Sequence, residues 1–132
     1  MEKTYIIERF VSSCQELAFI RDSVNDEVLF ANEPFWELTK GVKSYDLARR
    51  RSVNPKEHSG YSFCEYVEQE FKKTKQPTFA FEEFGDKFFV SSRFLIEYKN
   101  NPAILVIITE SKGDDAPFND IYSCQTKKYL YP

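Results

Sequence analysis

The segment Ala103–Thr109 constrains the fold of this chain more than any other part of the sequence. Its central residues, from Ile104 to Ile108, are all aliphatic. Successive side chains of a strand point to opposite faces, so a strand that is apolar at every position needs cover on both sides. The run is far shorter than the roughly 20 residues of a membrane-spanning helix. We therefore expect this segment to be the middle strand of a sheet that is covered on both faces.

Two predicted β-hairpins supply the other strands of this sheet. The first covers Leu17–Ala31 and turns at residues 23–26, where Asn and Asp favour a tight turn. The second joins Thr78–Phe84 to Lys87–Tyr98 through a two-residue Gly-Asp turn. The second hairpin has a period of two, which is typical of strands, and Leu17–Asp22 of the first is short and partly β-branched or aromatic.

Three segments have the pattern of helices. Residues 4–15 place apolar side chains at three- and four-residue spacings, which predicts an amphipathic helix. Asn32 is a good N-cap for a short helix that Gly41 ends. Residues Ser62–Lys75 begin with a Ser-x-x-Glu capping box and carry their Lys residues late, which suits the helix dipole.

The order of these elements indicates the fold class. Two groups of hairpin-linked strands separated by helices are typical of an α+β fold with one antiparallel sheet. A chain of 132 residues fits a single domain. We expect this domain to span residues 1–112, and we expect the polar residues 113–132 to be a linker or C-terminal tail.

The charge of the chain argues against a nucleic-acid-coating protein. Its 18 basic and 21 acidic residues give a net charge of −3, whereas phosphate binding needs a surplus of Lys and Arg. The one basic run, Arg49-Arg50-Arg51, lies between residues 40 and 58, where we expect short helical turns and a mobile loop broken by Pro55. We interpret the run as a solvated face and expect no direct contact of this domain with nucleic acid.

The sequence favours a cytoplasmic location without metal. The N-terminus lacks the apolar core of a signal peptide, and no apolar run is long enough to cross a membrane. The three cysteines, Cys14, Cys64 and Cys124, are odd in number and widely spaced. This arrangement favours neither a disulfide framework nor a zinc site.

The first hairpin and the helix after it resemble a known family. Phe19–Asp22, a turn, and then Val28–Thr39 with its Asn-Glu-Pro-Phe-Trp-Glu-Leu run resemble the opening of a PAS sensory domain. The later helix, the Gly-Asp hairpin and the final aliphatic strand are similar to the rest of that family, so the resemblance covers roughly residues 5–112. Gly41 comes about one residue later than the family's usual glycine.

The resemblance implies a five-stranded antiparallel sheet of order 2-1-5-4-3 with helices on one face. It places the aliphatic segment in the middle strand, as the residue pattern does independently. The N-terminal amphipathic helix is then the available cover for the other face, and a second copy of the domain could complete it. Within the family, the chain is similar to N-terminal PAS domains of small bacterial helix-turn-helix transcription regulators, such as plasmid conjugative-transfer activators, although no helix-turn-helix follows here.

The predicted sites follow from this arrangement. A homodimer is expected to form through the apolar face of the first helix, at Ile6, Ile7, Phe10 and Val11. A small apolar or aromatic ligand is expected among aromatic residues that face the helices, with Ser92 as the polar anchor. These pocket residues are Phe35, Trp36, Phe63, Phe71, Phe88, Ser92 and Phe94. The alternative is a plain packed core without a ligand.

No residue pattern requires covalent chemistry or a cofactor. His58, the only histidine, lies in a polar stretch that suits a solvated side chain better than a haem ligand. Cys64 is expected to be a small buried apolar residue, and the flavin-binding motif of light-sensing relatives is absent. An acid–base enzyme of the ketosteroid-isomerase-like type would need a carboxylate in an apolar pocket. Glu83 or Glu97 could serve, but alternation turns both toward solvent.

The sequence therefore predicts a non-enzymatic sensory or dimerisation PAS module of a bacterial signalling or transcription-regulatory protein. It would act through a change in dimer geometry that a ligand or partner drives. The small α+β enzyme and a ligand-free interaction scaffold are the alternatives.

Overall fold

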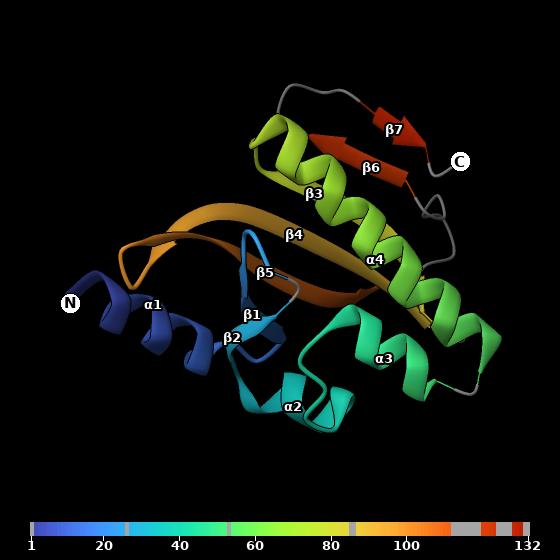
Figure 1. Cartoon of the computed structure of the whole chain (residues 1–132), viewed down its shortest axis with the longest axis horizontal. Helices are drawn as coiled ribbons and strands as arrows, with labels where there is room; N and C mark the ends of the chain where they lie inside the picture. Colours follow the sequence, from blue (N-terminus) through green and yellow to red (C-terminus); the bar gives the residue numbers. More distant parts are fainter. Residues whose placement is uncertain are drawn as a thin grey trace.

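The computed structural model describes residues 2–25, 27–52, 54–84, 87–111, 120–123 and 128–130. These residues form four helices and seven strands (Figure 1). In chain order the elements are α1 (Glu2–Ser13), β1 (Leu17–Asp22), β2 (Val28–Ala31), α2 (Glu33–Thr39), α3 (Tyr45–Arg51), α4 (Pro55–Thr74), β3 (Thr78–Phe84), β4 (Lys87–Tyr98), β5 (Asn101–Ser111), β6 (Asp120–Ser123) and β7 (Lys128–Leu130).

All seven strands belong to one antiparallel sheet of order β2-β1-β5-β4-β3-β6-β7. The first five positions confirm the predicted order and the predicted α+β class. The aliphatic strand β5 lies between β1 and β4, where Leu105 is opposite Ile20 on one side and Phe94 on the other. The middle position in this five-stranded part explains why β5 is apolar on both faces.

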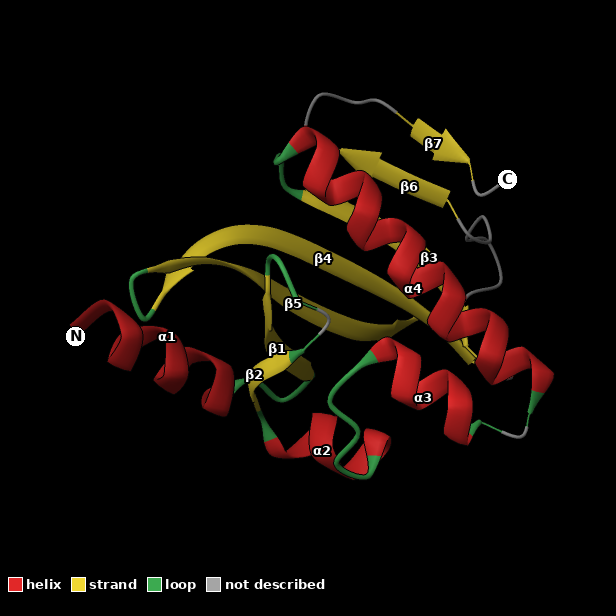
Figure 2. Cartoon of the chain, in the orientation of Figure 1, coloured by secondary structure: helices red, strands yellow, loops and turns green. Residues whose placement is uncertain are grey.

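One face of the sheet, which we call the cup face, packs against the helices α2 and α4. Phe19 of β1 and Val106 of β5 form a buried cluster there with Phe35 of α2 and Phe71 of α4. Figure 2 shows how α4 runs across the strands on this side. Burial of large apolar side chains at about 25 cal/mol per Å² is the main force that holds these helices on the sheet.

The opposite face, which we call the α1 face, carries a second core. Val11 of α1 packs there against Ala18, Ile20 and Leu105, with Ile7 half-buried beside them. The N-terminal helix therefore covers part of the second face of the sheet, as the sequence predicted.

Asn32 fixes the position of α2 with its whole amide group. Its Oδ1 accepts hydrogen bonds from the backbone N–H of Phe35, which caps the helix, and of Ala18 on β1. Its Nδ2 donates to the carbonyl oxygens of Cys14 and Glu16. One buried side chain thus joins the start of α2 to the connection between α1 and β1, because an amide can accept and donate at once.

The helix that follows Asn32 ends at Thr39, and Gly41 comes directly after the C-cap residue Lys40, as expected for a C-terminal stop. Lys40 already adopts a left-handed conformation, with φ 56°, and its N–H donates to the carbonyl of Trp36. Gly41 continues in the same region with φ 82°, so the glycine prolongs a turn that Lys40 begins.

The predicted start of the longest helix is wrong. Helix α4 begins at Pro55, seven residues before Ser62, so the Ser-x-x-Glu sequence lies inside the helix and caps nothing. A proline is tolerated in the first turn of a helix because its missing N–H has no partner to lose there. Pro55 therefore starts a helix, whereas it was expected to break the short helical turns and loop of residues 40–58, and α3 lies in the segment before it.

The predicted C-terminal tail is corrected where the structure describes it. Strand β6 pairs with β3 in the register Ala80 opposite Ile121, and β7 pairs with β6. Ile121 is buried against Phe63 and Val67 of α4 and against Ala80. Four residues are enough to extend the sheet here, and a strand this short has no period in the sequence that would predict it. The predicted turn at residues 85–86 lies outside the described residues, although Phe84 pairs with Lys87 across it.

No helix in the described ranges is both long enough and apolar enough to cross a membrane.

The packing of β6 predicts that Ile121→Ala lowers the free energy of unfolding by about 2–4 kcal/mol, because the truncation leaves a cavity in a fully buried cluster. Urea denaturation of both proteins measures this difference. Val24→Ala, in an exposed turn, is the control and should change the value by less than about 0.5 kcal/mol. An Ile121→Ala protein as stable as the wild type would contradict the packing of β6 on α4.

Candidate functional site

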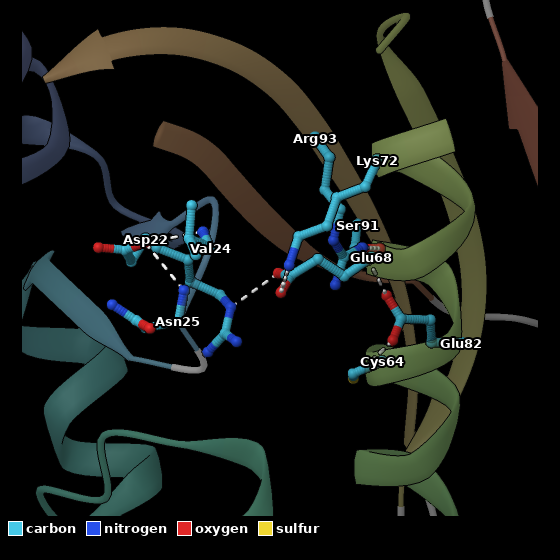
Figure 3. A network of polar contacts seen from close by, with 10 residues as sticks. Asp22, Val24, Asn25, Cys64, Glu68, Lys72, Glu82, Ser91 and Arg93 are labelled. Carbon is cyan, nitrogen blue, oxygen red and sulfur yellow. Dashed lines mark hydrogen bonds and ion pairs between the residues drawn. The ribbon is translucent and has the colours of Figure 1, made fainter. Parts of the chain in front are cut away.

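A layer of charged residues lies within the core on the cup face. Arg21 comes from β1, Glu68 from α4, Glu82 from β3 and Arg93 from β4, and each is at most 5% exposed. Figure 3 shows Glu68, Glu82 and Arg93 of this layer close together beside α4. Fully buried charges are rare and usually paired, so this layer is the feature of the core that most needs an explanation.

The positions of these residues follow from strand and helix periodicity. Arg21 is two residues after Phe19 on β1, and Glu82 is two residues after Ala80 on β3, so both point to the cup face with their apolar neighbours. Glu68 is next to Val67 on the buried side of α4. The charged layer therefore uses positions that the pattern reserves for core residues.

Arg21 and Glu68 form a buried ion pair between the first strand and the longest helix. The Nε atom of Arg21 donates to Oε1 of Glu68 at 2.7 Å. Lys72, one turn further along α4, places its Nζ 4.0 Å from the other carboxylate oxygen of Glu68. A charge-assisted hydrogen bond of this length is roughly twice as strong as a neutral one.

Glu82 lies at the centre of a second polar group. Its Oε1 accepts a hydrogen bond from the thiol of Cys64 on α4 at 2.8 Å. Its Oε2 is 3.9 Å from Nη1 of Arg93, and that nitrogen donates to the hydroxyl of Ser91 at 2.9 Å. Burial, and then the neighbouring Glu82 carboxylate, raise the pKa of Cys64 well above its usual value, so the sulfur keeps the proton that it donates.

A cavity of about 70 Å³ opens beside this polar group. Its wall is almost entirely apolar and comes from β1, α2, α4, β3, β4 and β5. The lining residues are Leu17, Phe19, Phe35, Leu38, Thr39, Tyr61, Cys64, Glu82, Phe84, Phe89 and Ile108. A second cavity of about 40 Å³ shares Phe19, Phe35, Thr39 and Tyr61 with the first and reaches Arg21.

Gly60 allows α4 to approach the mouth of the larger cavity. A Cβ atom at this position would collide with the ring of Phe84, whose edge also packs against Tyr61 with ring centroids 4.7 Å apart. The absence of a side chain at Gly60 therefore lets Phe84 form part of the cavity wall.

The structure divides the predicted pocket residues among several places. Phe35 lines the cavity. Phe63 and Phe71 are buried in the two core clusters of the cup face, and Trp36 lines a polar surface hollow beside Glu33 and Glu37.

The prediction of a single pocket is wrong for three of its residues. Phe88, Ser92 and Phe94 lie on the α1 face. In the sheet register Ser92 is opposite Ile107 and Phe94 is opposite Leu105, and both partners pack with the α1 cluster. The prediction that these residues share one face of β4 is correct, but the prediction that this face meets the helices of the cup is wrong. Ser92 therefore cannot anchor a ligand in this cavity.

Of the residues considered for other chemistry, Cys64 lines the cavity, and His58, Glu83 and Glu97 do not. His58 is exposed near the start of α4, and Glu97 is exposed near the end of β4. Glu83 pairs with Phe88 on the α1 face of β3. Within the described ranges, no three His, Cys, Asp or Glu side chains come together as a metal site.

The predicted dimer residues also separate into two groups. Val11 is fully buried against the sheet of its own chain, so it offers no free surface and is corrected, whereas Ile7 is half-buried beside it. Ile6 and Phe10 are 62% and 48% exposed, and Tyr5 beside them is 60% exposed. The outward side of α1 therefore exposes three large apolar or aromatic side chains beside the charged residues Lys3 and Arg9, and the Arg9 guanidinium lies 5.7 Å from the centre of the Tyr5 ring.

Sequence reasoning missed the charged layer itself. The predicted site residues include none of Arg21, Glu68, Glu82 and Arg93. On α4, the neighbouring carboxylate of Glu70 forms an ion pair with the exposed Lys73, at 3.0 Å. The available signal was strand parity, since Arg21 and Glu82 both share a face with residues that must be buried.

Comparison with solved structures identifies the architecture. A PAS domain from a two-component sensor histidine kinase matches with a TM-score of 0.52 and 14% identity, over 83% of this chain and 97% of that one. The fold is that of a PAS domain. The LOV protein of Rhodobacter sphaeroides, at a TM-score of 0.51 and 12% identity, matches over 87% of this chain and 71% of its own. No protein-family model matches the sequence, and no curated protein matches it significantly.

These similarities confirm the PAS-like fold and nothing finer, because the identities are low. The strands β6 and β7 add to the five-stranded PAS-like sheet at its β3 edge.

The buried pair predicts a strong asymmetry between single and double substitutions. Arg21→Met leaves the Glu68 carboxylate buried without its main partner and should lower the free energy of unfolding by about 3–5 kcal/mol. Arg21→Met combined with Glu68→Leu should recover most of this loss, because an apolar pair of similar volume is tolerated. Urea denaturation measures both values.

Lys73→Met removes one member of the exposed pair with Glu70 and is the control, with an expected change below about 1 kcal/mol. A double variant that is as unstable as Arg21→Met alone would contradict the coupling of Arg21 to Glu68.

Proposed function

We propose that this chain is a sensory module in which a small molecule bound in the cup changes how the domain associates with a second copy. The observation that carries the proposal is the cavity beside Glu82, enclosed between the sheet and α4 and lined by apolar side chains. Binding sites of this kind are concave and apolar, with a few placed polar groups. The PAS-like fold, which is also the fold of a sensor histidine kinase domain, supports the same assignment.

The sheet itself connects the cavity to the proposed dimer surface. Phe19 lines the cavity on the cup face of β1, while its neighbours Ala18 and Ile20 pack under Val11 of α1. A ligand that displaces Phe19 would therefore strain the strand on which α1 rests. Packed cores respond to such strain by shifting whole elements rather than by local compression.

The second copy is proposed to dock on the outward side of α1. The exposed residues Tyr5, Ile6 and Phe10 are adjacent on this helix, and exposed clusters of large apolar side chains mark interaction surfaces more often than isolated ones do. Phe94, which is 37% exposed on the α1 face of β4, extends the apolar surface beyond the helix.

The cellular context is part of the proposal. We infer a cytoplasmic role in bacterial signalling or transcription regulation, which rests on the resemblance of the first hairpin and α2 to PAS domains of small regulators. No cofactor and no catalytic step is needed for this role. The acid–base enzyme loses its two predicted carboxylates, because neither Glu83 nor Glu97 lines the cavity, and it would have to use Glu82, which does. A ligand-free scaffold would not explain why a carboxylate lines this cavity.

The dimer surface is tested by substitutions on the outward side of α1. Ile6→Asp and Phe10→Asp should each raise the dissociation constant of the dimer at least about tenfold, because they place a charge in an apolar contact that is worth more than about 1.4 kcal/mol. Sedimentation equilibrium over a concentration series measures the change. Ser12→Asp adds the same charge at another exposed position of the same helix and should leave the dimer unaffected.

A wild-type protein that remains monomeric up to its solubility limit would refute the dimer. Native mass spectrometry of freshly purified protein tests the ligand separately, since a sensor of this kind should show a population with additional bound mass or acquire one on addition of a ligand.

A further inference from the structure

The cavity of about 70 Å³ between the sheet and α4 offers almost nothing to a hydrogen-bonding molecule, because polar atoms make up very little of its wall. The hydroxyl of Thr39 donates to the carbonyl of Phe35 in its own helix at 2.9 Å. The thiol of Cys64 donates to Oε1 of Glu82, and Oε2 of the same carboxylate has almost no accessible surface. The polar groups beside the cavity are therefore engaged or out of reach.

A wall of this kind excludes water and charged or strongly polar molecules. A water molecule in a protein interior typically makes about three hydrogen bonds, and an apolar cavity that cannot supply them stays dry. An ion or a polar group that is buried without a partner loses its hydration without compensation. The molecules that remain make no hydrogen bond, and for these the same wall is favourable because their apolar surface leaves water.

The volume of the cavity limits the size of such a molecule. About 70 Å³ is roughly half of the ~150 Å³ of an engineered apolar cavity that binds benzene, so about three or four heavy atoms are the right size. The rings of Phe19, Phe35 and Phe89 form part of the wall, together with Leu17 and Ile108. These rigid and branched side chains favour a compact body over an extended one.

Leu38 marks the place where the cavity meets the protein surface. This residue belongs to the cavity wall and is nevertheless 54% exposed, near the end of α2. Exposed side chains change rotamer within picoseconds to nanoseconds. A small molecule can therefore enter beside Leu38 without any opening of the core.

We infer that the cavity binds a compact, uncharged, apolar molecule of about three or four heavy atoms that makes no hydrogen bond, such as a short branched hydrocarbon. This inference rests on the proposed sensory function and names the ligand class that its cup would recognise. Recognition by shape and burial replaces the predicted polar anchor Ser92, which lies on the α1 face opposite Ile107.

Isobutene and acetone test the inference directly, because the two molecules have the same size and trigonal shape but only acetone carries a hydrogen-bonding oxygen. Each is titrated into ¹⁵N-labelled wild-type protein, and the amide shifts of Phe19, Cys64 and Ile108 locate the binding. Isobutene should bind at least about tenfold more tightly than acetone, since the carbonyl oxygen would be buried without a donor. Benzene, which suits a cavity of about twice this volume, should bind more weakly than isobutene.

Ile108→Trp and Ile107→Trp are the matched variants. The two residues are half-buried neighbours on β5, but Ile108 lines the cavity whereas Ile107 packs with the α1 cluster on the opposite face. The larger indole at position 108 occupies the space of the ligand, so the affinity for isobutene should fall at least about tenfold. Ile107→Trp should keep the affinity. The comparison of the three probes on the wild-type protein stands even if Ile108→Trp does not fold.

Acetone binding as tightly as isobutene would overturn the inference, because the cavity would then supply a hydrogen bond. Tighter binding of benzene would overturn the size limit, and the absence of any shift with isobutene would overturn the site itself. Isobutene binding that survives in a folded Ile108→Trp protein would place the molecule elsewhere.

The proposed function fails separately from this ligand class. A polar or charged molecule found bound to the purified protein removes the ligand class and keeps the sensor. A strict monomer removes the dimer-based output and keeps the isobutene result.

Discussion

The ion pair between Arg21 and Glu68 joins the first strand of the sheet to the longest helix, and the space under α4 depends on it. Helix α4 also packs through Phe63, Val67 and Phe71, but apolar contacts are non-directional and would tolerate many small rotations of the helix. A hydrogen-bonded pair of 2.7 Å has one geometry. By fixing the rotation of α4, it also holds Cys64, one turn earlier, against Glu82 on β3. A buried ion pair can add little net stability. In this account its main effect is to select one orientation of α4 on the sheet.

The two faces of the sheet carry two different roles in this account. On the cup face, the strands supply aromatic rings and the side chain of Glu82 to the wall of a small cavity. On the α1 face, the same strands support a helix that exposes Tyr5, Ile6 and Phe10. Because successive residues of β1 alternate between the faces, Phe19 belongs to the cavity while Ala18 and Ile20 belong to the support of α1. The six residues of β1 therefore contact both the proposed ligand cavity and the helix that carries the proposed dimer surface.

Much of the fold was predictable from the sequence, and the reasons are local. The aliphatic run of β5 required a central strand, and Asn32 required a helix start, since each has few structural alternatives. The start of α4 was wrong because a capping sequence and an N-terminal proline are both valid start signals, and the sequence does not rank them. The side of β4 was wrong because alternation defines two faces without saying which one meets the helices. The charged layer was missed because Arg21 and Glu82 look like solvent-facing residues until the partners that pair with them are placed by the fold.

Hydrogen exchange of the Arg21 Nε–H group tests the central claim most directly, since this hydrogen is the one that the pair with Glu68 holds away from water. In ¹H–¹⁵N spectra at neutral pH, the account predicts a resolved and slowly exchanging Arg21 Nε–H signal with nuclear Overhauser contacts to the side-chain protons of Glu68. A signal lost to rapid exchange with solvent, or contacts to any other helix in place of α4, would contradict it.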